Sequence, residues 1–186
     1  MTVTAVYDAN VLYPSLLRDL LIRIAVAGAV RARWTDLILD EVFRNLRADR
    51  PDLDSGLLIR TRSLMNDAIR DVLVSDFEHL IDELQLPDEN DRHVLAAAVH
   101  AHAEVIVTFN LKDFPDDALR ARGVVAQHPD AFLTERFDED PAVVTEALDR
   151  ISAATRNPHR TVAELVRRLQ ASGLPMLADR LDPARD

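Results

Sequence analysis

The sequence of 186 residues contains no cysteine, which excludes disulfide bonds, thiolate nucleophiles and zinc–thiolate centres. It also lacks any apolar run approaching the roughly 20 residues that a membrane-spanning helix needs. The first residues, Met1–Asp8, lack the basic start, apolar stretch and cleavage site of a signal peptide. From these absences we expect a cytoplasmic chain without a membrane partner.

Positive charge is scarce. The chain has 22 Lys and Arg against 32 Asp and Glu, for a formal net charge of −10. This balance argues against a uniformly basic nucleic-acid binder, but an enzyme built on carboxylates could still carry a local cationic surface. Lys112 is the single lysine, and between Arg44 and Arg70 six arginines face four acids. That stretch is either a surface for RNA phosphates or a solvated helix face with ion pairs.

Hydrophobic periodicity predicts alternating strands and helices. Short β-branched, apolar segments indicate strands at 3–7, 72–74, 105–108 and 124–126. Helical spacing or helix-start signals predict helices at 15–28, 35–50, 54–71, 93–102, 117–122 and from 128 onward, with a weaker helical stretch at 77–84. This alternation predicts the α/β class, with a three-layer α/β/α domain around a mostly parallel central sheet.

A polar segment, Phe137–Pro141, suggests a boundary, so we assign residues 1–136 to the main domain and 137–186 to a C-terminal helical extension. Helices are expected at 141–155 and 161–172, the second with a capping box that starts at Thr161. The extension is too short for a sizeable core of its own. We therefore expect it to pack on the main domain or on a partner.

Several polar side chains are predicted to meet at one edge of the sheet. Open parallel sheets bind ligands beyond the carboxyl ends of their strands. Asp8 ends the first strand, and Asn110 and Asp113 follow the strand at 105–108. Asp91 begins the helix before that strand, and in a right-handed crossover its start lies near the same edge. Glu41 could lean over this edge from its own helix.

Carboxylates that converge in one cleft repel each other, and a divalent cation relieves the conflict. Oxygen-only ligands favour Mg²⁺ or Mn²⁺ over zinc, and such ions can activate water for phosphodiester cleavage. Each residue also has an ordinary structural explanation: Asp8 as a turn residue, Asp91 as a helix start and Glu41 as a solvated side chain. The spacing alone therefore leaves the reaction type open.

Four segments in order resemble the PIN-domain family, over about residues 3–133. They are Val6–Leu12, Trp34–Glu41, Asp88–Ala98 and Val107–Phe114. The resemblance implies a PIN-like fold and RNA cleavage that depends on Mg²⁺ or Mn²⁺. It further suggests a VapC-type toxin ribonuclease of a bacterial type II toxin–antitoxin pair.

Carried over residue by residue, Asp8, Glu41 and Asp91 fall on the family's acidic positions. The fourth position usually holds an aspartate and here holds Asn110. Either the amide oxygen of Asn110 or the carboxylate of Asp113 would complete the catalytic and metal-binding set. Asn10 and Thr108 match positions that support the acidic residues through hydrogen bonds.

The resemblance implies an RNA substrate and a cognate antitoxin that masks the acidic cleft, and the extension is a candidate docking surface or homodimer contact. One rival is a catalytically inactive PIN-like module that binds RNA or protein, which Asn110 favours. A second is a phosphoacceptor signalling domain. That class needs an early pair of adjacent acids, which the first strand lacks.

Overall fold

The computed structural model describes residues 2–182. Residue 1 of the predicted main domain and residues 183–186 of the predicted extension lie outside the described residues. Its centre is a sheet of four parallel strands in the order β2-β1-β3-β4. The strands are β1 (Val3–Tyr7), β2 (Val30–Arg33), β3 (Val105–Val107) and β4 (Val125–Gln127). The α/β class predicted from the sequence is confirmed.

The strand order creates a switch point between β1 and β3. From β1 the chain first adds β2 on one side and later adds β3 on the other, so Val6 pairs with both Arg33 and Ile106. At such a point the connections leave in opposite directions, which opens a crevice beyond the carboxyl ends of the two strands. Asp8 follows β1 directly into this crevice.

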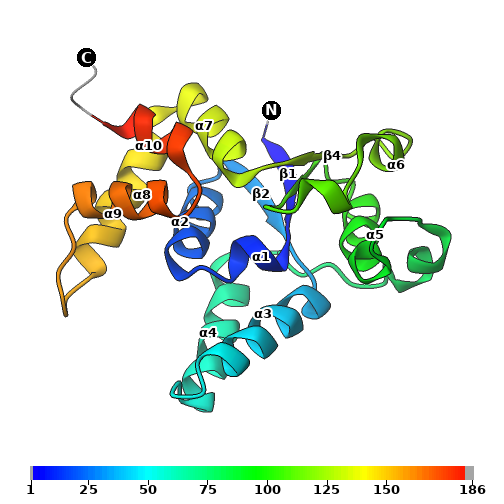
Figure 1. The fold of residues 1–186 in the computed structure, drawn as a ribbon, viewed down its shortest axis with the longest axis horizontal. Coiled ribbons are helices and arrows are strands. Elements are labelled where there is room, and N and C mark those ends of the chain that lie inside the picture. The colour runs from blue at the N-terminus through cyan, green and yellow to red at the C-terminus, as the bar shows by residue number, and fades with distance from the viewer. Residues whose placement is uncertain (1, 183–186) are drawn as a thin grey trace.

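Ten α-helices and three short 3₁₀ helices surround the sheet within residues 2–182 (Figure 1). The α-helices are α1 (Ala9–Leu12), α2 (Ser15–Val26), α3 (Asp36–Asp49), α4 (Ser55–Ala68), α5 (Arg92–His100), α6 (Asp116–Arg120), α7 (Pro129–Glu139), α8 (Pro141–Ala154), α9 (Val162–Ala171) and α10 (Pro175–Leu181). The 3₁₀ helices are η1 (Glu78–Glu83), η2 (Glu89–Asp91) and η3 (Leu111–Asp113).

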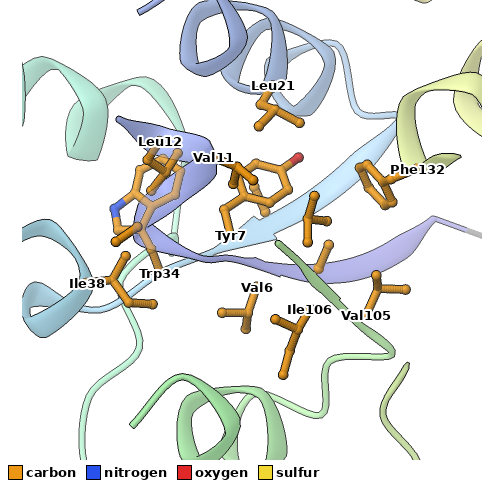
Figure 2. Close-up of a cluster of buried hydrophobic side chains, with 14 of the residues drawn as sticks. Val6, Tyr7, Val11, Leu12, Leu21, Trp34, Ile38, Val105, Ile106 and Phe132 are labelled. Carbon is orange, nitrogen blue, oxygen red and sulfur yellow. The ribbon is translucent and has the colours of Figure 1, made fainter. Parts of the chain in front are cut away.

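The core has two halves, one on each face of the sheet. Successive side chains of β1 point to opposite faces: Tyr7 lies with Leu21 of α2 and Phe132 of α7, whereas Val6 and Ile106 point toward α5 (Figure 2). The rings of Tyr7 and Phe132 meet edge to face at 6.3 Å. Each such buried side chain contributes about 1.5–3 kcal/mol. The three-layer prediction is confirmed.

Helix α3 starts where the sequence predicts. The Thr35 side chain accepts a hydrogen bond from the Ile38 backbone N–H at 3.1 Å and so caps the helix. The preceding Trp34 is fully buried, and its Nε1 donates to Asn66 Oδ1 at 2.9 Å. This anchoring sets the direction in which α3 carries Glu41.

Three local predictions need correction. Strand β2 was not predicted, because its four residues alternate apolar side chains with arginine and give only a short pattern. The expected strand at 72–74 is reduced to an isolated bridge between Trp34 and Leu73. Asp71 and Asp76 flank that segment with positive φ and so interrupt extended backbone on both sides. The helix expected at 77–84 is the 3₁₀ helix η1.

The C-terminal helices pack on the main domain, with α8 against α2 and α7, and α10 against α7 and α9. Asp130, buried within α7, accepts hydrogen bonds from the backbone N–H groups of Met176 and Leu177, both at 2.9 Å, and thereby caps α10. The capping box at Thr161 is confirmed. The predicted division after residue 136 falls inside α7 and stays a prediction. None of the helices in residues 2–182 has the length and apolar character to cross a membrane.

Candidate active site

Asp8 sits at the switch point and is only 6% exposed. Its Oδ1 accepts a hydrogen bond from the Ala9 N–H at 2.7 Å. Its Oδ2 accepts from Asn10 Nδ2 and from Thr108 Oγ1, each at 2.7 Å. Asn10 Nδ2 also donates to Thr108 Oγ1 at 2.9 Å. The expected supporting bonds are therefore present, and they tie the ends of β1 and β3 together around one carboxylate.

The charge of Asp8 is held by hydrogen bonds alone, since no Arg, Lys or His between residues 2 and 182 forms an ion pair with it. Burial raises the pKa of this carboxyl, the bonds from Thr108, Ala9 and Asn10 lower it, and the charge of Asp113 raises it further. A carboxylate that is oriented but not neutralised can accept a cation.

Asp91 lies at the N-terminus of α5, but its side chain makes no capping hydrogen bond. The ordinary explanation as a helix cap therefore does not account for it. Its pKa is raised to about 7, first by burial and then by the negative charges of Asp8, Asp88, Asp113 and Glu41. Asp91 thus shares an electrostatic environment with the neighbouring Asp88 and with carboxylates from three other parts of the chain.

Glu41 reaches the same edge from α3, which packs against α1 and thus lies beside Asp8. The side chain is half-buried, and its pKa is raised mainly by burial and then by Asp8. Arg44, one turn further along the helix, lowers that pKa, and Asp88 raises it. The prediction that Glu41 is near Asp8 agrees with this mutual influence.

Asn110 and Asp113 act together. The Asn110 backbone N–H donates to Thr108 Oγ1 at 3.0 Å, and its side-chain amide donates to the carboxylate of Asp113. Asn110, which precedes η3, therefore holds Asp113 in place at the end of that helix. Asp113 raises the pKa of both Asp8 and Asp91, so its charge acts on the same two carboxyls. The choice between Asn110 and Asp113 for the fourth position stays a prediction.

The donor chemistry of the cleft fits a hard cation, since every candidate ligand is an oxygen and the carboxylates repel one another. Within residues 2–182, however, no three Asp, Glu or His side chains already enclose a position for a metal ion. The carboxylates interact across the cleft without closing into a ligand shell. The ligand set of Asp8, Glu41, Asp91, Asn110 and Asp113 stays a prediction.

The structure adds residues that sequence reasoning missed. The Phe109 N–H donates to Asn10 Oδ1 at 3.1 Å, and the Phe109 ring meets the His128 ring edge to face at 5.0 Å. A side chain at Gly173, in the extension, would lie 3.5 Å from the same ring. Phe109 thus links the polar network of Asp8 to the C-terminal helices. Nothing in the local sequence signals contacts between such distant segments.

The arginines from 44 to 70 divide into two groups. Arg62 pairs with Asp36 and Asp40, Arg50 pairs with Asp52, and Arg70 lies 4.0 Å from Asp71. Arg44, Arg47 and Arg60 form no ion pair with any residue that the structure describes. Both interpretations of this stretch hold in part, because some of its arginines are neutralised and others remain open to an anionic ligand.

Comparison with known proteins places the chain in a family. The model of the PIN domain matches residues 4–112, more than half of the chain, and the model of the VapC50 C-terminal domain matches residues 129–183. The chain therefore belongs to the PIN-domain family. A curated protein of Mycobacterium tuberculosis (strain ATCC 25618 / H37Rv), named "Putative ribonuclease VapC50", is 43% identical over 99 residues. That similarity spans 46% of this chain and 59% of the relative. No solved structure matches the chain significantly.

Proposed function

We propose that the chain is a metal-dependent endoribonuclease that hydrolyses RNA phosphodiester bonds, and that it is the toxin of a type II toxin–antitoxin pair. The observation that carries the proposal is the mutual influence of Asp8, Glu41, Asp91 and Asp113 at the carboxyl ends of β1 and β3. Membership of the PIN-domain family and the name of the similar mycobacterial protein support the reaction type.

In this proposal the chain's own residues bind and orient. Bound Mg²⁺ or Mn²⁺ would supply a Lewis acid that activates water and stabilises the leaving oxygen. Asp8 is fixed by its three donors and forms the rigid part of the ligand set. Glu41, Asp91 and Asp113 provide the remaining carboxylates, with Asn110 as the residue that orients Asp113.

The test is cleavage of a mixed cellular RNA pool with Mg²⁺ or Mn²⁺, comparing the native chain with Asp8→Ala and Asp91→Ala. We expect discrete products that disappear with EDTA and fall by at least about 100-fold in both variants, because each removes a charged ligand. Asp82→Ala, which removes an exposed acid of η1, is the matched control and should cleave normally. Cleavage that survives in both site variants would contradict the assignment.

An inactive PIN-like module is the second candidate, and the specific observation in its favour is Asn110 at the position where the family usually has an aspartate. Such a module would still bind RNA or protein but cut nothing. Calorimetric titration of the folded native chain with Mn²⁺, combined with the cleavage assay, separates the candidates. Tight metal binding without cleavage of any RNA in the pool, or no metal binding at all, would favour the module.

The VapC-type resemblance supports an antitoxin partner for this chain. We expect it to cover the acidic cleft, with a basic side chain inserted among Asp8, Glu41 and Asp91. Co-expression with the product of a candidate antitoxin gene tests this directly. A stable complex in which RNA cleavage is suppressed would support the toxin assignment. Absence of both binding and inhibition would contradict that assignment.

A further inference from the structure

A polar pocket of about 350 Å³ lies away from the acidic cleft, between α2 and the connection from α8 to α9. Three arginines line it, Arg156, Arg160 and Arg168, together with Asn157 and with Ser15 at the start of α2. In Figure 1 this connection runs at the outer edge of the extension, and residues of α2 line the same pocket. The pocket therefore joins the extension to the main domain.

The three arginines form no close ion pair. None of them forms an ion pair with an acid in residues 2–182, whereas Arg180 of the same extension pairs with Asp138 at 3.2 Å. Two acids lie close to the pocket, and the pKa of one of them, Glu164, is lowered first by hydrogen bonds from Thr161 and then also by the charge of Arg160. Asp19, which also lines the pocket, pairs with Arg23 at 2.8 Å. Glu164 accepts hydrogen bonds from the backbone N–H and hydroxyl of Thr161, at 2.8 and 3.2 Å.

The chemistry of the pocket favours phosphate over a protein partner. Arg156 and Arg168 are exposed, and the planar guanidinium fork binds phosphate oxygens in pairs. Of the apolar lining residues, Ile151 and Leu165 are buried, Leu16 is half-buried and Pro158 is exposed. Three arginines share the lining with this small exposed apolar area. In a chain with a net charge of −10, such a local cationic surface points to a polyanion.

The pocket is also within reach of a ligand that occupies the acidic cleft. Ser15 lies seven residues after Asp8, which limits their separation to about 25 Å, and α1 between them shortens it further. Arg44 and Arg47, which have no ion pair in the part of the chain described, lie on α3 near Glu41. Cationic side chains thus lie both on the helix that carries Glu41 and in the separate pocket beside α2.

We propose that the pocket formed by Arg156, Arg160 and Arg168 binds backbone phosphates of single-stranded RNA outside the cleft, so that the extension enlarges the substrate-binding surface. The identity of the ligand rests on the proposed ribonuclease function, but binding can be measured without cleavage. Removal of the pocket's charge lowers the affinity for long RNA. It also reduces the dependence of that affinity on salt, because binding with fewer phosphate contacts releases fewer counterions.

The experiment measures fluorescence anisotropy of labelled single-stranded RNA in EDTA, at salt concentrations from about 50 to 200 mM. The variant is Arg156→Ala with Arg168→Ala, both at exposed positions where substitution costs little stability. Arg31→Ala with Arg122→Ala removes the same charge from exposed positions outside the pocket. For the pocket variant we expect the slope of log affinity against log salt to be shallower by about 1.4, at about 0.7 per contact, and the control to match the native chain.

An unchanged slope in the pocket variant, or an equal loss in the control, overturns the proposal. An unchanged RNA slope with weakened binding to polyglutamate also overturns it, in favour of an acidic protein partner. A native chain that cuts no RNA but shows the predicted difference in slope leaves this binding surface standing and removes only the ribonuclease. If the native chain cuts RNA but the pocket and control variants bind RNA with equal affinity, the ribonuclease stands and the binding surface is removed.

Discussion

The ionisation of Asp91 depends on residues that are remote from it in the sequence. Its pKa of about 7 arises from burial and from carboxylates on three other segments, whereas an unfolded chain would show about 3.9. The folded state therefore disfavours the ionised form. This penalty is absent below about pH 4, grows as pH rises from about 4 to 7, and is complete above that window.

Replacement of Asp91 by asparagine should remove this penalty. In metal-free solution we expect Asp91→Asn to melt a few degrees above the native chain at pH 8, since about 1 kcal/mol corresponds to about 2–4 °C in a domain of this size. At pH 4 the two should melt together. Thermal melts across this range check the prediction, with Asp82→Asn as the control. A difference in melting temperature that does not change with pH would contradict it.

Asn110 offers the opposite change, in which a charge is added. Asn110→Asp should bind Mg²⁺ or Mn²⁺ about tenfold more tightly, because ligand charge sets the affinity of such sites. Without metal the variant should be less stable, since its carboxylate would face Asp113 instead of donating to it. Calorimetric titration and melts with EDTA measure both effects. Unchanged metal affinity would mean that position 110 lies outside the ligand set.

At the scale of single elements, α3 illustrates how a local signal positions a site residue. Thr35 is fully buried and caps the helix that carries Glu41. We expect Thr35→Ala to lower the free energy of unfolding by about 1 kcal/mol, up to about 2. Thr35→Ser, which keeps the hydroxyl, should recover part of this loss. Urea denaturation gives both values, and equal losses in the two variants would show that the methyl group matters instead of the cap.

Strands were harder to predict than helix starts. The segments at 30–33 and 72–74 are both short, yet only the first becomes a strand of the sheet. Val30 and Ala32 are buried between α2 and β1, whereas Val72 is limited to hydrogen bonding around Trp34. Pairing between strands depends on neighbours that are distant in the chain. A window of four residues therefore does not predict whether a segment joins the sheet.

For the whole molecule, Asp130 is one of the contacts that join the extension to the rest. We expect Asp130→Ala to cost about 1–3 kcal/mol, because the N–H groups of Met176 and Leu177 lose their buried acceptor. Asp138→Ala removes a surface ion pair between the same two helices and should cost less than about 1 kcal/mol. Denaturant titrations compare the two. A smaller loss for Asp130→Ala than for Asp138→Ala would mean that the extension is held elsewhere.

The sequence by itself determined the α/β class, the helix caps at Thr35 and Thr161, and the order of the acidic residues along the chain. These features depend on periodicity and on contacts within a few residues, and the residue pattern alone predicts both. Only the tertiary structure decided that Asp113 is held by Asn110, that Asp91 titrates near neutrality, and that an arginine pocket forms beside α2. The bond from Thr108 to Asp8 joins residues 100 positions apart, and such contacts exist only once the packed core has brought the segments together.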